Sequence, residues 1–582
     1  MIIKKTLITL LVLIMHVAAW AQSEQLTITT DSAGQLARLL PDTLRYTMAE
    51  LKVVGPINGN DLRILKMIAA HLANKKSNER ILTTLDLSEA ELNESKGAFR
   101  TSTEAFPAAL FVNSKALEKV ILPKGMLTIS KSCFSGCVSL KEVILPDELM
   151  VIDDNAFLNC QSLTTINLPT TLNKIENHAF DGCKSLDSLN LPAAVDVIDS
   201  YAFNKCSNLQ KIGLDCAINR IPNNAFSGCE RLEEVVLPQS VKSIGDEAFM
   251  GCIALKAIKL PETLTGIGIG AFEGCNSLQL VELQTATRIE REAFKDCASL
   301  HTVEIESINR LGNNAFENCL GLATVNLGGN LGEIDDETFR GCTNLTQVKL
   351  PGTVKKIGIK AFYECKSLPS IQMPGALTEI KDHAFENCAS LRSILIPNLT
   401  KKIGSNAFEG CTSLDSVNIQ GFIEKLESDV FRYCHSLRTV ILPVSIKSIG
   451  DNAFQECSSL EEIKLPISIN SIGDNAFEKC ATLRSIGIPA ACKSIGSAAF
   501  RECSGLATVE LPAALKKIGG NAFAKCVSLH EVVCRSPIPP TLTHSSFKGV
   551  VLAACRIIVP RGSRATYRKD KIWNRLPQIV EQ

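Results

Sequence analysis

The chain has 582 residues, 45% hydrophobic and 21% charged, a composition typical of a folded protein rather than a disordered one. Its 61 basic and 61 acidic residues cancel, which excludes the global positive field that gathers nucleic acid or anionic lipid. The length would suit three or four ordinary domains, unless internal repetition replaces them. Composition therefore predicts no nucleic-acid partner.

The N-terminal stretch MIIKKTLITLLVLIMHVAAWAQ has the parts of a signal peptide. Two lysines precede an apolar run, and two alanines flank a tryptophan at a cleavage position. The run is too short to cross a bilayer, which needs roughly 20 apolar residues. We therefore expect a signal peptide at residues 1–21 and a mature chain without a transmembrane segment. Its expected location is secreted or at the cell surface, with the periplasm as an alternative.

Residues 22–109 are expected to form an N-terminal cap that contains a first degenerate repeat. Asn60 or Asp61 is placed to cap a helix. The apolar face of this helix is predicted to carry Leu62, Leu65, Ala69 and Leu72. A strand pattern, LTTLDL, follows at residues 82–87. Such a segment would cover the first turn of a repeat array, which arrays need for solubility.

A repeat of about 23 residues occupies residues 110–534. Each of its 18 regular turns has a phenylalanine three residues before a cysteine and a leucine three residues after it. The column cysteines are Cys137, Cys160, Cys183, Cys206, Cys229, Cys252, Cys275, Cys297, Cys319, Cys342, Cys365, Cys388, Cys411, Cys434, Cys457, Cys480, Cys503 and Cys526. This period and its L-x-x-L-x-L core predict a leucine-rich repeat solenoid of parallel strands and short helical turns.

One turn shows the structure expected of all of them. In LEEIKL, residues 460–465, apolar side chains alternate with charged ones as in a strand, and Pro466 ends that strand. A short second strand should follow, and Gly473 is expected to turn the chain with a positive φ. Asp474 or Asn475 is then predicted to cap a single helical turn.

The column cysteines are interpreted as small apolar fillers inside the solenoid. A metal site needs ligands that converge on one point, and the chain has no C-x-x-C pair. Stacked turns also place equivalent Cβ atoms slightly beyond the range that disulfides prefer. A buried ladder of free thiols is therefore favoured, although the sequence leaves disulfides between some of the 23 cysteines open.

The repeat, L-x-x-I-x-L-P-x-x-L-x-x-I-G-x-x-A-F-x-x-C, resembles that of the BspA-like leucine-rich repeat family of bacterial surface proteins. The resemblance covers residues 110 to 534. It implies a non-catalytic solenoid, some of whose relatives contact host proteins. It also implies a C-terminal cap, residues 535–582, in which Tyr567 and Trp573 pack back on the last turn.

The sequence predicts no catalytic residue, cofactor site or metal site, because we find no convergent acid, base, nucleophile or ligand pattern. Binding is the expected activity, since stacked turns present outward side chains on a fixed frame. The least regular stretch is a pair of 22-residue turns that lacks the strand-end proline. The candidate binding residues there are Leu280, Glu282, His301, Glu304 and Glu306.

Two functions follow from these observations. The first is an exported protein-binding solenoid, a surface or secreted adhesin whose ligand is a host extracellular or cell-surface protein. The scarcity of tyrosine and tryptophan in the regular turns favours protein contact over glycan capture. The alternative is a structural component of the cell envelope that acts through self-association.

Overall fold

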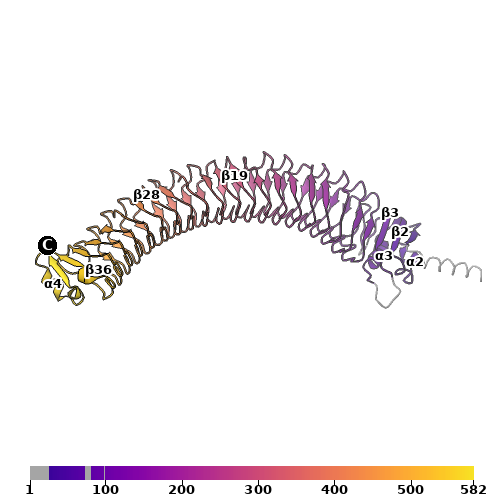
Figure 1. The fold of residues 1–582 in the computed structure, drawn as a ribbon. Helices are drawn as coiled ribbons and strands as arrows, with labels where there is room; N and C mark the ends of the chain where they lie inside the picture. Colours follow the sequence, from indigo (N-terminus) through magenta and orange to yellow (C-terminus); the bar gives the residue numbers. More distant parts are fainter. Residues whose placement is uncertain (1–24, 73–79, 97–98) are drawn as a thin grey trace, which may run out of the picture. The chain divides into compact units, whose positions relative to one another are not determined.

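The computed structural model describes residues 25–72, 80–96 and 99–582, so the predicted signal peptide at 1–21 lies outside the described residues. The chain divides into two compact units, residues 1–278 and 279–582, and each is a stack of turns joined by parallel strands (Figure 1). Among the described segments, no helix is both long and apolar enough to cross a membrane.

The first unit begins with strands that extend the same sheet as the regular turns. Its N-terminal elements are β1 (Gln25–Thr29), α2 (Leu36–Leu39), β2 (Glu50–Ile57), α3 (Gly59–Ala69) and β3 (Thr84–Leu92). Its main strands are β4 (Lys119–Ile121), β6 (Glu142–Ile144), β9 (Ser188–Leu191), β11 (Lys211–Leu214), β13 (Glu234–Val236) and β15 (Ala257–Lys259). Its second strands are β5 (Thr128–Ile129), β7 (Val151–Ile152), β8 (Lys174–Ile175), β10 (Val197–Ile198), β12 (Arg220–Ile221), β14 (Ser243–Ile244) and β16 (Gly266–Ile267).

The second unit repeats this alternation of main and second strands. Its main strands are β17 (Leu280–Val281), β19 (Thr302–Ile305), β21 (Thr324–Leu327), β23 (Gln347–Lys349), β26 (Ser393–Ile396), β28 (Ser416–Ile419), β30 (Thr439–Ile441), β33 (Ser485–Gly487), β35 (Thr508–Leu511), β37 (Glu531–Cys534), β38 (Arg556–Val559) and β39 (Gln578–Glu581). Its second strands are β18 (Arg288–Ile289), β20 (Arg310–Leu311), β22 (Glu333–Ile334), β24 (Lys356–Ile357), β25 (Glu379–Ile380), β27 (Lys402–Ile403), β29 (Lys425–Leu426), β31 (Ser448–Ile449), β32 (Ser471–Ile472), β34 (Ser494–Ile495) and β36 (Lys517–Ile518). Its helices are η1 (Leu552–Ala554), α4 (Arg564–Lys569) and η2 (Trp573–Arg575).

The third side of each turn is a run of tight turns and not the predicted helical turn. In the turn that contains β32, Asn475 and Lys479 have φ values of 53° and 62°, which interrupt any helix. The prediction for Gly473 was also wrong, because its φ is not positive. An added Cβ on Gly473 would lie 2.7 Å from the Gly450 carbonyl carbon, so close stacking of turns is what favours glycine there.

The residue before every column cysteine adopts the left-handed conformation. Glycine or asparagine occupies this position in many turns, as in Gly228, Gly251 and Asn387, because these residues tolerate a positive φ. Lys479 and Tyr433 adopt the same conformation despite their side chains. The backbone of the turn is therefore maintained even where the residue type opposes it.

Stacked phenylalanines and thiols fill the core. The rings of Phe454 and Phe477 lie parallel with centroids 5.2 Å apart, and both side chains are fully buried. The Cys480 thiol donates a hydrogen bond to the Phe454 carbonyl oxygen of the preceding turn, with Sγ and O 3.2 Å apart. The cysteine is thus buried as predicted, and it also satisfies a backbone acceptor that an alanine would leave with one partner fewer.

The predicted cap helix exists, but its cap differs from the prediction. Asn58 is the N-cap of α3, and Asp61 completes a capping box as the third helical residue. The Asp61 carboxylate also accepts the backbone N–H of Leu36 at 2.8 Å, which ties α3 to α2. Leu62 is buried with the rest of the predicted face, whereas Leu72 lies beyond the helix and is exposed.

The C-terminal segment closes the last turn as the family resemblance implies. Tyr567 and Trp573 are completely buried. The Tyr567 hydroxyl donates to the Ser536 carbonyl at 2.9 Å, and Trp573 Nε1 donates to the Pro540 carbonyl at 2.7 Å. These bonds satisfy the polar ends of two large aromatic side chains that cover the apolar end of the stack.

A first prediction concerns the left-handed position. Gly251 has a φ of 71° and no close neighbour for an added Cβ, so substitution there tests conformation without steric overlap. We expect Gly251→Val to destabilise the chain by about 1–2 kcal/mol. Gly251→Asn is the matched control and should cost less, because Asn159 occupies the equivalent position. Thermal denaturation measures both variants, and equal losses would contradict the assignment.

A second prediction concerns the thiols. Burial raises the pKa of Cys229 to about 12 and that of Cys480 well above its ordinary value, so the reactive thiolate is scarce at pH 8. A thiol-specific chromogenic reagent should therefore react with almost no cysteine of the native chain at pH 8. In denaturant without reductant, all 23 cysteines should react. Fewer reactive thiols in denaturant would indicate disulfides.

Candidate binding surfaces of the second unit

The five predicted binding residues lie together on the outer face of β17 and β19. Leu280 pairs with Thr302 in the parallel register of these strands, which places Glu282 next to Glu304. All five predicted side chains are exposed, and Leu280 retains 53% of its accessible surface. The structure therefore brings these residues together, and their role in binding is a proposal taken up below.

This strand face concentrates negative charge. Like charges on neighbouring strands repel each other, so the adjacent carboxylates of Glu282 and Glu304 do not stabilise the fold. Glu306 adds a third exposed carboxylate at the end of β19, and the His301 Nδ1 atom lies 2.8 Å from the Ser299 carbonyl oxygen. A partner with a basic surface would relieve the repulsion between the carboxylates.

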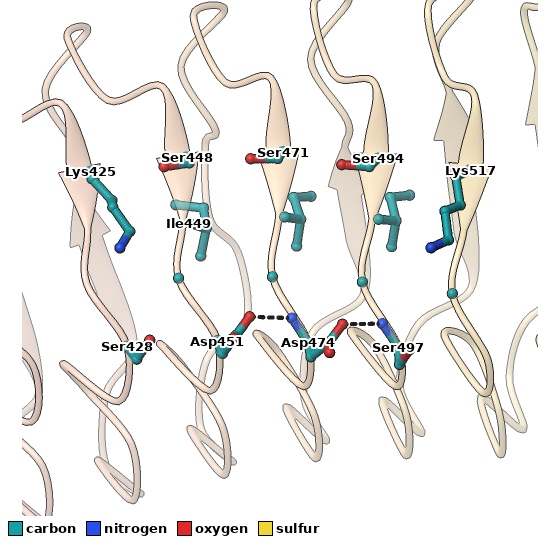
Figure 2. A pocket seen from close by; sticks show the side chains of 16 residues that line it. Lys425, Ser428, Ser448, Ile449, Asp451, Ser471, Asp474, Ser494, Ser497 and Lys517 are labelled. Atoms are coloured by element: carbon teal, nitrogen blue, oxygen red, sulfur yellow. Dashed lines mark hydrogen bonds between the residues drawn. The ribbon is translucent and has the colours of Figure 1, made fainter.

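A second surface is a shallow groove across β29, β31, β32, β34 and β36. Figure 2 shows its floor, where Ser448, Ser471 and Ser494 form a row between Lys425 and Lys517. The groove has a volume of about 400 Å³. Within the described part of the second unit, the three serine hydroxyls make no hydrogen bond to protein, so they face solvent as donors and acceptors.

The carboxylates of this groove hold the stack together. Asp451 Oδ1 accepts the backbone N–H of Asp474 at 2.7 Å, and Asp474 Oδ1 accepts that of Ser497 at 2.6 Å (Figure 2). Two lysines and two aspartates give the lining no net charge. The groove can contact a polar chain through its hydroxyls, but it has no concentration of one charge.

A third surface was missed by the sequence analysis. At the bend between main and second strands, four successive turns carry an exposed bulky apolar side chain, and we call these four residues the apolar corner. They are Leu399, Phe422, Val444 and Ile467, with 53%, 66%, 82% and 85% of their surface exposed. The sequence signal was present, because glycine or polar residues such as Gly352 and Asn330 occupy this bend in other turns.

A group of carboxylates in the first unit resembles a cation site in composition only. One oxygen each from Asp153, Asp154 and Glu176 lies within 4.8 Å of the others. Lys131 already donates to this group, with its Nζ 2.9 Å from Asp154 and its backbone N 3.1 Å from Asp153. The Lys131 ammonium also lowers the pKa of Asp154. The protein itself thus supplies positive charge and donors to these carboxylates.

Another acidic group lies on the second strands of the second unit. Partial burial, together with the neighbouring Glu333 and Asp336, raises the pKa of Asp335 to about 6. Lys381 bridges the other two, with its Nζ 2.6 Å from Glu333 and 3.3 Å from Asp336. Asp335 is therefore the carboxyl group of this cluster whose charge is least favoured.

The fold and its repeated columns define a leucine-rich repeat solenoid. The family model for the BspA type leucine-rich repeat region matches residues 104–233, 219–346, 332–447 and 424–550. The chain belongs to this BspA-type leucine-rich repeat family. Repeats of this class generally act as non-enzymatic scaffolds for protein interaction.

Solved structures of bacterial leucine-rich repeat proteins are similar to this chain. One from Bacteroides ovatus is 29% identical, with coverage of 62% of this chain and 92% of its own and a TM-score of 0.53. A leucine-rich cell surface protein from Faecalibacterium prausnitzii is 24% identical, with coverage of 60% and 87% and a TM-score of 0.33. The pneumococcal vaccine antigen PcpA is 18% identical, with coverage of 68% and 89% and a TM-score of 0.33. No curated protein sequence matches the chain.

A third prediction follows from Asp335. Because its folded pKa lies above the ordinary aspartate value, the unfolded chain loses this proton first as pH rises from about 4 to about 6. Asp335 therefore lowers the free energy of unfolding above pH 6 and has no such effect below pH 4. Asp335→Asn should stabilise the chain at pH 7 by about 1 kcal/mol, a value reduced for solvent screening.

The thermal midpoint of Asp335→Asn, measured at pH 4 and at pH 7, tests this assignment. Glu462→Gln removes an exposed carboxylate elsewhere in the same unit and controls for the loss of one negative charge. An equal change in midpoint at both pH values would contradict the raised pKa, because the effect would then not arise from ionisation.

Proposed function

We propose that the chain is an exported, non-catalytic binding protein, a surface or secreted adhesin that contacts a host extracellular or cell-surface protein. The observation that carries the proposal is the acidic strand face of β17 and β19, formed by Glu282, Glu304 and Glu306 beside Leu280. Exposed carboxylates around an apolar side chain suit a protein surface with basic residues.

The frame beneath this face supports binding without rearrangement. Four residue pairs join β19 to β21, from Thr302 with Thr324 to Ile305 with Leu327. The inward side chains of Val303 and Ile305 are buried. Because the backbone is held on both sides, outward side chains are preorganised and lose little conformational freedom on binding.

Export is supported by the signal-peptide pattern at residues 1–21 and by membership of a family of bacterial surface proteins. A mature chain that begins at Gln22 would have 59 basic and 61 acidic residues, since Lys4 and Lys5 are removed. It would therefore remain nearly neutral, and local charge such as the acidic strand face would determine which partners it attracts.

A structural role in the envelope is the second candidate, and the apolar corner favours it. Large exposed apolar patches on a soluble surface mark interaction sites. Because this corner lies in turns distant in sequence from β17 and β19, self-association and binding of an external protein are compatible in one chain.

A fourth prediction tests the acidic strand face. Mature protein, residues 22–582, is applied to an array of host matrix proteins, serum proteins and glycans. We expect saturable binding to a protein, and we expect Glu282→Lys/Glu304→Lys to weaken it at least about tenfold, because like-charge contacts replace attractive ones.

Glu234→Lys is the matched control, since Glu234 is an exposed glutamate on β13 of the first unit. It should leave the affinity unchanged. Binding that is equally weak for both variants would assign the effect to net charge rather than to this face. No protein bound at micromolar concentration would refute the adhesin proposal and favour the envelope role.

A further inference from the structure

The apolar corner exposes more hydrophobic surface than isolated surface residues do. The outward side chains of Leu395 on β26 and Ile441 on β30 are also exposed, by 52% and 54%, on the adjoining main strands. With these two, the corner presents about 800 Å² of apolar surface, if a fully exposed side chain of this size contributes roughly 200 Å². Most monomers have no patch above about 600 Å², and one side of a stable interface buries about 800 Å².

The backbone under the corner is fixed from turn to turn. Ser468 Oγ donates to the carbonyl oxygens of Val444 at 2.7 Å and Ile446 at 2.6 Å. In the preceding turn, Ser445 Oγ donates to the Ile423 carbonyl at 2.8 Å. The exposed side chains therefore stand on a rigid edge and do not belong to a loop that could fold over them. Leu399 and Phe422 occupy one position of the repeat, and Val444 and Ile467 occupy the position before it.

We propose that the apolar corner binds the apolar corner of a second copy of this chain, with the two stacks antiparallel. The two-fold axis would pass between the turns of Phe422 and Val444. Phe422 of one copy would then face Val444 of the other, and Leu399 would face Ile467. This proposal does not depend on the identity of the external partner.

The charges on both sides of the corner alternate in sign over four turns in one column and over three turns in the other. One column precedes the main strands and contains Arg392, Asp415, Arg438 and Glu461, all exposed. The other column precedes the second strands and contains Lys401, Glu424, Lys447 and Asn470, also exposed. Neighbours of opposite sign within each column also pair inside the chain, with Lys447 Nζ 2.7 Å from Glu424 and Arg438 Nε 3.8 Å from Asp415. A second copy would add contacts to these pairs and would not neutralise unpaired charges.

This alternation selects the antiparallel arrangement. When the stacks run in opposite directions, each column faces its own copy in reverse order, so Asp415 meets Arg438 and Glu424 meets Lys447. When the stacks run in the same direction, the two columns face each other turn by turn. Asp415 would then meet Glu424, and Arg438 would meet Lys447. Like charges across an interface repel each other, so the parallel arrangement is opposed.

A second copy is the occupant that matches the corner best. Its side chains come from successive turns, which are stacked roughly 4.8 Å apart, and another stack of the same kind presents side chains at that interval along its edge. An interface between identical patches requires self-complementarity. Under the two-fold axis the first column provides it in all four turns, and the second column provides it through Glu424 and Lys447. The balanced charge of the whole chain, 61 basic and 61 acidic residues, adds no long-range repulsion between copies.

The oligomeric state of the mature chain, residues 22–582, tests the proposal by sedimentation velocity over a range of concentrations. We expect a dimer at micromolar concentration and a monomer for Phe422→Asp/Ile467→Asp, with dimerisation weakened at least about a hundredfold. Val527→Asp is the matched control, since Val527 is 58% exposed in the same unit outside the corner, and it should remain dimeric. Circular dichroism confirms that each variant is folded.

Charge exchange tests the orientation. In the antiparallel dimer, Glu424→Lys places two lysines in contact and should weaken dimerisation about tenfold. The double variant Glu424→Lys/Lys447→Glu restores both contacts and should restore the wild-type affinity. In a parallel dimer, Glu424→Lys would instead meet Asp415 and strengthen the association.

A wild-type chain that remains monomeric, or a dimer that survives Phe422→Asp/Ile467→Asp, would overturn the proposal. Stronger dimerisation of Glu424→Lys would overturn the antiparallel geometry. The assay contains no external protein, so its failure leaves the adhesin proposal intact, and failure of the binding array leaves this proposal intact.

Discussion

Turn-to-turn stacking in register is the constraint on which the rest of the structure depends. Parallel backbone hydrogen bonds hold each turn to the next, so every side chain lies directly beside its counterpart one repeat away. A residue type therefore suits a repeat position only if its side chain packs favourably against the side chain at the same position one turn away. Phenylalanine satisfies this condition by parallel stacking, as in Phe477 and Phe500 with centroids 5.3 Å apart. Charged residues satisfy it by alternation of sign, as in the ion pair between Lys479 and Glu456 at 2.5 Å.

The same constraint separates surfaces that only complete the stack from surfaces available for binding. In the serine groove, Asp451 and Asp474 are committed to the backbone of the next turn. On the strand face, Glu282 and Glu304 place like charges side by side, and these two carboxylates repel each other. At the apolar corner, bulky side chains remain in water although small or polar residues suit the same bend. Positions where a residue gains little from the residue at the same position one turn away are therefore the best structural indication of a binding surface in this chain.

Periodicity predicted most of the fold, because a buried column leaves the same residue type in every turn. The main strands, the second strands, the stacked phenylalanines and the buried Cys480 were all predictable in this way. Conformation was less predictable than burial. Gly473 was expected to have a positive φ, whereas the left-handed positions are Asn475 and Lys479, and a lysine carries no sequence signal for that geometry. The strand-face residues could be proposed from irregular spacing. The corner around Phe422 was missed because the repeat template leaves that bend undefined.

The cysteine hydrogen bonds give the stack a direction. Column thiols such as Cys480 and Cys503 donate to a phenylalanine carbonyl of the turn before, so acceptors and donors are offset by one turn. At the start of the column, Ser114 replaces the cysteine, and its hydroxyl has no partner among the described residues. The two cut ends of a shortened solenoid would therefore differ chemically. One would expose a weak thiol donor, and the other would leave a backbone carbonyl without its second partner. The thiol bonds therefore give the two ends of a stack of turns different chemistry, a donor at one end and an acceptor at the other.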